Sequence, residues 1–364
     1  MPVADDRLPN CRPSMVPAVA GVSGAVLCSG PNRKGYSEML TKDVLKLDAA
    51  AAVAEIEEAI RTQVMGTLKR RGVVLGVSGG IDSSVTAALC AKALGGERVQ
   101  ALLMPERDSS DASLELGQAL GKKFGIPTLI ENIGPIVAAA GCYDRQDEAI
   151  RMVFPDYRPG WRFKVTLPSI LEGDRLNVSE LTVVSPDGTT RSARMPLKPY
   201  LQLIAATNFK QRIRKMMEYY HADRLNYAVA GTPNRLEYDQ GFFVKQGDGA
   251  ADFKPIAHLY KTQVFQLAEH LGVPEGIRSR TPTTDTFSLA QTQEEFYFAL
   301  PYDRMDLCLY GRNHSIAASE MAGVVGLTAE QVERVYRDID QKRRGTRYLQ
   351  LYPLLVSPVP EISH

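Results

Sequence analysis

Apolar runs alternate with helix-forming stretches in the first half of the chain. Residues 43–70 are rich in alanine, glutamate and other strong helix formers, which predicts a long helix. Residues 73–77 and 99–104 are continuous apolar runs, typical of strands that are buried on both faces of a parallel sheet. The other elements predicted here are helices at 85–96 and 112–124 and a strand at 126–131.

The order of these elements predicts the fold. A strand–helix series of this kind forms a parallel sheet with right-handed crossovers. The pattern resumes with a helix at 208–221, a strand at 225–231 and a helix at 261–271. We therefore predict an α/β protein with a single, doubly wound, Rossmann-like parallel sheet.

Residues 151–200 interrupt this pattern. They contain many prolines and turn residues, and residues 178–195 surround the pair Asp187-Gly188, which favours a tight turn between two strands. The polar alternation on either side predicts a hairpin instead of a crossover helix. We interpret the segment as an insertion that acts as a lid, a subunit contact or a surface decoration.

The two ends of the chain are predicted to be tails around one domain. Residues 1–38 form a flexible tail, because the apolar stretch 14–29 is broken by a proline and two glycines and follows a segment that is not basic, unlike a secretory signal. Met39 is an alternative start. The domain is expected to span 39–345 and a C-terminal tail 346–364.

Composition excludes several classes of protein. The chain is 44% hydrophobic and 23% charged with a net charge of +1, which is ordinary for a globular protein and gives no bulk attraction to nucleic acid. No apolar run approaches the roughly 18 residues of a membrane span. The five cysteines lack metal-ligand spacing, and their odd number argues against a disulfide framework. We expect a cytoplasmic protein with reduced thiols, and neither nucleic acid nor membrane as a partner.

A loop rich in glycine and serine follows the first predicted strand, with the sequence Ser78-Gly79-Gly80-Ile81-Asp82-Ser83-Ser84. Its glycines let the backbone approach a ligand, and the helix that follows offers free N–H groups, so the loop suits phosphate. A carboxylate at Asp82 beside phosphates is explained by a bridging Mg²⁺. The Gly-Lys-Ser/Thr ending of kinase and GTPase loops is absent. Alternatively, the segment is only a capped helix after a glycine turn.

This loop resembles the SGGxDS loop of the ATP pyrophosphatases with the adenine-nucleotide hydrolase-like fold. In that superfamily the loop holds the β,γ-pyrophosphate while a substrate oxygen attacks the α-phosphate. NAD, GMP, asparagine and argininosuccinate synthetases and tRNA-thiolating enzymes all carry it, so the loop alone does not choose among them.

Residues 231–261 are more specific. They contain a Gly-Thr pair, a glutamate five residues after that threonine, then Gly-Phe-Phe-x-Lys, Gly-Asp-Gly, an aspartate and a lysine. This series resembles the second signature of NAD synthetases in order and spacing. The chain is similar to the ammonia-dependent members of that family over most of residues 40–345, apart from the insertion.

The resemblance implies a role for individual residues. The ATP contacts would be Gly76, Ser78, Gly79, Gly80, Asp82, Ser83, Ser84, Thr232, Lys261 and Thr283. The Mg²⁺ ligands would be Asp82 and Glu237. The contacts to the dinucleotide substrate would be Arg212, Lys245, Asp252 and Lys342. The catalytic residues would be Asp82, Lys261 and Asp248, the last near the ammonia site.

Several of these residues also have an ordinary explanation. Glu237 and Asp252 would be solvated loop charges, Lys261 a surface residue at a helix start, and Arg212 part of a charged helix face. The chain also departs from the family pattern, because Pro233-Asn234 follows Thr232 in place of an aspartate, and Gln341 precedes Lys342 where a histidine is common. These departures concern the carboxylate substrate more than ATP.

The implied reaction is the amidation of deamido-NAD to NAD. Its nicotinate carboxylate attacks the α-phosphate of ATP, pyrophosphate leaves, and ammonia displaces AMP from the adenylate. About 70 residues precede the first strand, too few for a glutaminase domain, so ammonia would be free or supplied by a separate glutaminase. The resemblance also implies a homodimer.

Three alternatives stay open at this point. An amide ligase of the same fold would act on another carboxylate. A tRNA-thiolating enzyme would need a basic patch and catalytic cysteines, and the sequence shows neither. A regulator that binds nucleotides without turning them over would not need the carboxylates at 82 and 237.

Overall fold

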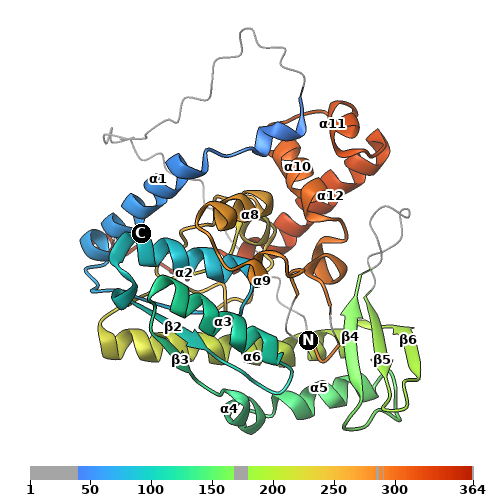
Figure 1. Ribbon diagram of the computed structural model, residues 1–364. Helices are drawn as coiled ribbons and strands as arrows, with labels where there is room; N and C mark the ends of the chain where they lie inside the picture. The colour runs from blue at the N-terminus through green and yellow to red at the C-terminus, as the bar shows by residue number, and fades with distance from the viewer. Residues whose placement is uncertain (1–39, 168–178, 284–286, 290, 363–364) are drawn as a thin grey trace, which may run out of the picture. The chain divides into compact units, whose positions relative to one another are not determined.

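The structure is a computed structural model, and it describes residues 40–362 apart from 168–178, 284–286 and 290 (Figure 1). The described residues from Leu40 onward form one unit by their contacts. The predicted tail 1–38 and the alternative start at Met39 lie outside the described residues. The predicted domain bounds stay predictions.

Four parallel strands form the central sheet in the order β3-β2-β1-β7. Their bounds are Val73–Gly76 for β1, Val99–Leu103 for β2, Thr128–Ile130 for β3 and Ala228–Val229 for β7. β1 pairs with β2 on one side and with β7, from much later in the chain, on the other. The strand order therefore reverses beside β1, and in open α/β sheets ligands bind at the carboxyl ends of the strands at such a point.

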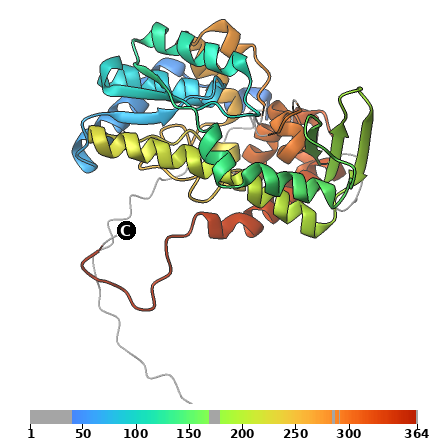
Figure 2. The ribbon, with the colours of Figure 1, turned by 90° about the horizontal axis from the view of Figure 1, so that it is seen from below.

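Helices cover both faces of this sheet. On one face lie α1 (Ala49–Arg61), α2 (Ile81–Leu94), α3 (Asp111–Phe124), α8 (Lys261–His270) and α9 (Glu275–Arg278). On the other lie α4 (Gly134–Ala139), α5 (Cys142–Arg151) and α6 (Leu197–Leu225), with α6 running beneath the sheet in Figure 2.

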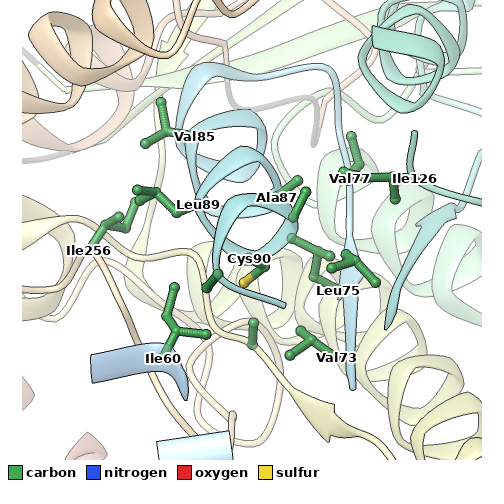
Figure 3. Close-up of a cluster of buried hydrophobic side chains, with 14 of the residues drawn as sticks. Ile60, Val73, Leu75, Val77, Val85, Ala87, Leu89, Cys90, Ile126 and Ile256 are labelled. Carbon is green, nitrogen blue, oxygen red and sulfur yellow. The ribbon is translucent and has the colours of Figure 1, made fainter. Parts of the chain in front are cut away.

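Alternate residues of β1 supply the two halves of the core. Val73 and Leu75 pack in the first cluster, whereas Val74 packs in the second. Figure 3 shows Ala87 of α2 near these strand residues and Leu89 on the opposite side of the helix, toward Ile256. The prediction of a doubly wound parallel sheet is confirmed.

Two predicted helices differ from the observed ones. The helix at 43–70 divides into a 3-10 turn (Lys42–Leu45), α1 and a π turn (Thr62–Thr67) that follows α1 directly. Asp48 separates the 3-10 turn from α1, because it caps α1 through a bond from Ala51 N at 3.0 Å. The helix at 208–221 extends over Leu197–Leu225. Its first turns pack against the inserted sheet through Tyr200 and Leu203, and the helix begins earlier than the predicted end of the insertion at residue 200.

The inserted segment forms a second sheet. β4 (Arg162–Thr166), β5 (Glu180–Val184) and β6 (Thr190–Arg194) are antiparallel in that order (Figure 1). The predicted hairpin is β5–β6, and its turn contains Gly188 at φ +87°. β4 is an additional strand that the sequence analysis did not predict. One face of this sheet is buried, through Phe163, Val165, Leu181 and Val183.

The last helices form their own core. Their shared core is formed by α7 (Arg235–Gln240), α10 (Tyr302–Asn313), α11 (Ala318–Val325) and α12 (Ala329–Thr346). The π turn Glu294–Phe298 packs into the same core. Short 3-10 turns lie at Gly96–Arg98 and Arg347–Leu349. Residues 350–362 form no helix or strand and are exposed. Among the described helices, none combines the length and apolar character needed to cross a bilayer.

Candidate active site

A cavity of about 500 Å³ lies at the carboxyl ends of β1 and β2 and beside the residues that follow β7. It therefore occupies the point where the strand order reverses. The predicted site residues that line it are Gly76, Ser78, Gly80, Asp82, Ser83, Arg212, Thr232, Glu237, Lys245, Asp248, Lys261 and Thr283. Four predicted residues do not line it: Gly79, Ser84, Asp252 and Lys342.

The loop after β1 is shaped by its own serines. Ser83 and Ser84 donate from their hydroxyls to the carbonyl oxygen of Gly80, at 3.0 and 2.8 Å. Gly80 N donates to Ser78 Oγ at 3.3 Å. Gly79 has φ +73°, and a Cβ there would lie 2.9 Å from Ser113 O, so only glycine fits. Gly79 and Ser84 thus shape the loop without lining the cavity.

Asp82 and Lys261 form an ion pair inside the cavity wall. Lys261 is the first residue of α8 and its side chain is 0% exposed, so the alternative explanation of Lys261 as a surface residue is wrong. The other oxygen of Asp82, Oδ1, accepts from Asn234 Nδ2 at 3.0 Å. Residues from β1–α2, α7 and α8 therefore meet at one carboxylate.

Glu237 lies on the first turn of α7, where it forms a capping box with Asn234. Its Oε2 accepts from Asn234 N at 3.0 Å and its Oε1 from Gln293 Nε2 at 3.3 Å. Burial, and then the negative charge of Asp82, raise the pKa of Glu237 to about 8. Asn234 thus bonds to both carboxylates through different atoms.

This pair of carboxylates has the chemistry of a magnesium site. Mg²⁺ is commonly held by one or two carboxylates together with substrate phosphates, and a cation would relieve the repulsion that raises the pKa of Glu237. In the described part of the chain, no group of three or more His, Cys, Asp or Glu side chains is arranged to hold a metal by itself. The donors therefore fit a cation that arrives with a phosphate ligand.

Two threonines bring hydroxyl groups to the same cavity. Thr232 follows β7, at a point where Gly231 N bonds to Phe253 O at 2.8 Å. Thr283 forms an isolated antiparallel bridge with Thr292.

Arg212 and Lys245 lie at another part of the wall. Arg212 Nε donates to the carbonyl oxygen of Lys245 at 3.2 Å, and Lys245 Nζ donates to Tyr348 O at 2.9 Å. Both side chains line the cavity although Arg212 is exposed. The two cations are thus available to an anion bound in the cavity.

Asp248 is presented by the turn Gly247–Gly249. Its Oδ1 accepts from Val244 N at 2.7 Å, and burial raises the pKa of Asp248. A Cβ on Gly249 would lie 2.2 Å from the ring of Phe243, so this close packing requires glycine. The turn therefore holds a carboxyl group with an increased proton affinity at the cavity surface.

Asp252 and Lys342 are placed elsewhere. Asp252 Oδ2 accepts from Val229 N of β7 at 2.7 Å and its Oδ1 from Tyr219 Oη at 3.3 Å. Lys342 Nζ donates to Tyr297 O at 2.8 Å and pairs with Asp338 at 2.7 Å, and burial lowers the pKa of Lys342. Because Tyr297 lines the cavity, Lys342 lies one layer behind the wall. Their roles toward substrate stay predictions.

The sequence analysis missed several residues of the wall. Glu218 of α6 lines the cavity and pairs with buried Lys215 at 2.6 Å, and its Oε1 would lie 2.9 Å from a Cβ on Gly76. Arg214 and Gln293 also line it. The spacing of Glu218 from Gln211 along α6 puts both on one helix face, which is a usable signal once the helix is known. No motif in the sequence around Gln293 indicates that it belongs to the site.

Comparisons with known proteins agree with this geometry. A model of the NAD synthase family matches residues 52–163 and 175–347. Over 318 residues the chain is 61% identical to the NH(3)-dependent NAD(+) synthetase of Mesorhizobium japonicum, a match that covers 87% of this chain and 100% of that protein. It is 59% identical over 329 residues to the protein of that name from Rhizobium rhizogenes, covering 90% and 99%.

Solved structures share the fold at low identity. The NH3-dependent NAD synthetase from Campylobacter jejuni matches with a TM-score of 0.55 and 22% identity, covering 85% of this chain and 100% of that one. NMN synthetase from Francisella tularensis matches with a TM-score of 0.56 and 22% identity, covering 85% and 98%. At this identity the likeness establishes the architecture only.

Proposed function

This chain belongs to the NAD synthase family, and we propose that it catalyses the ATP-dependent amidation of deamido-NAD to NAD with ammonia, releasing AMP and pyrophosphate. The observation that carries the proposal is the meeting of three features in one cavity. These are the loop Ser78–Ser84, the carboxylates of Asp82 and Glu237 with Lys261, and the cations Arg212 and Lys245.

ATP would bind with its β- and γ-phosphates on the loop, where backbone N–H groups at the start of α2 favour anions. Asp82 and Glu237 would hold Mg²⁺, which supplies electrostatic stabilisation of the charge on the leaving pyrophosphate. Lys261 contributes positive charge from the same side, and Thr232 and Thr283 offer hydroxyl groups to the nucleotide.

Deamido-NAD would place its negative diphosphate near Arg212 and Lys245, whose charges suit it. A nicotinate carboxylate oxygen then forms a bond to the α-phosphorus while the bond from phosphorus to the pyrophosphate oxygen breaks. The products of this step are the mixed anhydride with AMP and pyrophosphate. Positioning both substrates in one cavity removes much of the entropic barrier.

Ammonia completes the reaction at the adenylated carbonyl. Its nitrogen bonds to the carbonyl carbon, AMP leaves with the electrons of the C–O bond, and the nitrogen releases one proton. Asp248 is suited to accept that proton, because burial raises the pKa of its carboxyl group. No covalent bond to the protein is required in this scheme.

We further propose a cytoplasmic homodimer that uses free ammonia or ammonia from a separate glutaminase. Asp252 and Lys342 would act through their neighbours, because Asp252 holds β7 and Lys342 holds the backbone at Tyr297.

The test is product analysis with purified protein, MgATP, ammonium and deamido-NAD. Equal amounts of NAD, AMP and pyrophosphate are expected, and an Asp82→Ala variant should form none of them. Nicotinic acid mononucleotide, in place of deamido-NAD, serves as the competing carboxylate. Faster turnover of that mononucleotide would assign the chain to another amide ligase of the same fold.

A further inference from the structure

The free edge of the inserted sheet contacts the wall of the active site. β4 pairs with β5 on one side only, and an edge strand leaves N–H and C=O groups on the other side without strand partners. Leu289 N bonds to Phe163 O at 3.1 Å, and Leu167 N bonds to Glu295 O at 2.9 Å. The described residues within 287–296 therefore lie along this free edge of β4.

Side chains strengthen this contact. Gln291 is 3% exposed and its amide nitrogen donates to the carbonyl oxygen of Val165 on β4. Phe163 N donates to Ser288 Oγ at 2.9 Å. The Phe163 ring stands edge to face with Phe287 at a centroid distance of 5.6 Å. The insertion and the wall segment consequently share one hydrophobic cluster.

The side chain of Gln293, in the same segment, contacts the Glu237 carboxylate instead of β4. Its Nε2 donates to Glu237 Oε1 at 3.3 Å, and its Oε1 accepts from Tyr302 Oη at 2.7 Å. Glu237 Oε2 is already held by Asn234 N at 3.0 Å. Both oxygens of the Glu237 carboxylate are thus oriented, one by α7 itself and one by the wall segment.

We propose that the inserted sheet is part of the active-site architecture, and that it holds Gln293 as a positioning residue for the Glu237 carboxylate. This inference rests on the proposed role of Glu237 as a cation ligand. Hydrogen-bond partners that orient metal-binding carboxylates commonly change metal affinity or activity by about 10- to 100-fold when they are removed. The sequence analysis left the insertion open as a lid, a subunit contact or a decoration.

The experiment compares ATP affinity with saturating Mn²⁺ and in EDTA, measured by calorimetry. Gln293→Leu removes both amide bonds at similar size, and Gln291→Leu removes the anchor on β4. Thr182→Val is the matched control, because the Thr182 hydroxyl lies on β5 and bonds to Ser192 Oγ at 2.8 Å on the face away from the buried cluster. Thermal melting of each sample verifies that it is folded.

The Mn²⁺-dependent gain in ATP affinity should fall about 10- to 100-fold in Gln293→Leu, with affinity in EDTA unchanged. Gln291→Leu should lose part of the same gain, and Thr182→Val none. An unchanged gain in Gln293→Leu, an equal loss with and without Mn²⁺, or a Gln291→Leu that matches the control would overturn the inference.

Glu237→Ala separates this inference from the proposed function. If Glu237→Ala loses the Mn²⁺-dependent gain and Gln293→Leu keeps it, the cation site stands and only the positioning role is wrong. If Glu237→Ala keeps the gain, the cation assignment itself is wrong and the inference falls with it. NAD formation by the unaltered protein remains a separate measurement of the reaction.

Discussion

Single buried charges shape the active site, and Lys261 is the clearest of them. Its side chain is fully buried, and its charge is matched by Asp82, which stands next to a second carboxylate at Glu237. A buried ion pair is worth little as a source of stability, since desolvation offsets the attraction. In the proposed reaction, its value would lie in fixing a cation where negative charge gathers on the leaving pyrophosphate.

Lys261→Met should reduce kcat by about 10²- to 10³-fold, because the variant loses a preorganised positive charge beside the leaving pyrophosphate. Initial rates of AMP formation at saturating substrates measure this. Circular dichroism melting of the same sample separates lost chemistry from lost folding. A folded variant with the original kcat would remove Lys261 from the catalytic residues.

Asp306 makes stability depend on pH. Its carboxylate accepts from Thr262 N at 2.7 Å at the start of α8, yet burial raises its pKa to about 6. A folded-state pKa above the unfolded value favours the protonated form. The contribution of protonated Asp306 to the free energy of unfolding is therefore complete below about pH 4, and it is lost as the pH rises through about 6.

Asp306→Asn should flatten this loss, because an amide does not ionise and still offers one acceptor oxygen to α8. Chemical denaturation between pH 4 and 7 should show a smaller decline for the variant than for the unaltered protein. Asp306→Ala, which removes the acceptor, should cost about 1–3 kcal/mol at pH 4, where the carboxyl group of the unaltered protein is protonated. Parallel declines in Asp306→Asn and the unaltered protein would contradict the assignment.

At the scale of elements, α6 joins the parts of the site. Thr207, Gln211 and Glu218 of this helix line the cavity, and buried Lys210 reaches the loop that follows β2. Lys210 Nζ lies 3.1 Å from Glu106 Oε1 and 2.5 Å from Asp108 Oδ2. The helix therefore fixes a loop whose next residues, Ser109 and Ser110, line the cavity.

Lys210→Met should destabilise the protein by about 3–5 kcal/mol, because the buried Glu106 carboxylate would lose its cation and Asp108 would keep Arg107 at 3.3 Å. Urea denaturation at neutral pH measures the change. Lys198→Met on the same helix is the control, since Lys198 is exposed and should change stability by less than about 0.5 kcal/mol. Equal losses in both variants would mean that the cluster does not hold the loop.

Local patterns in the sequence predicted the elements that carry the ATP loop, since a strand, a glycine turn and a helix follow one another within residues 73–94. They also predicted the hairpin β5–β6 from its turn. They did not predict β4, which pairs with β5 across the intervening residues 167–179, or the place of Gln293, which bonds to Glu237 56 residues away, because neither contact leaves a local signal in the sequence. The burial of Lys261 likewise follows from packing between helices.

At the scale of the whole molecule, ligand binding should couple to stability. A ligand that binds only the folded protein stabilises it by about 2.7 kcal/mol at 100 times its Kd. MgATP should therefore raise the melting temperature, and EDTA should remove most of that increase. Differential scanning fluorimetry checks this, with Glu237→Ala expected to respond little to the cation. An EDTA-insensitive increase would argue against a cation between ATP and the two carboxylates.

The pairing of β1 with β7, and of Asp82 with Lys261, also has a consequence during protein synthesis. Asp82 and Lys261 are 179 residues apart, and the inserted sheet is translated between them. At roughly 5–20 residues per second, the ribosome needs on the order of 10–40 s to travel that far. For all of this interval the emerging chain carries its glycine loop without Lys261, and for most of it without Glu237 and β7. Capture of nucleotide should therefore begin only after most of the chain has left the ribosome.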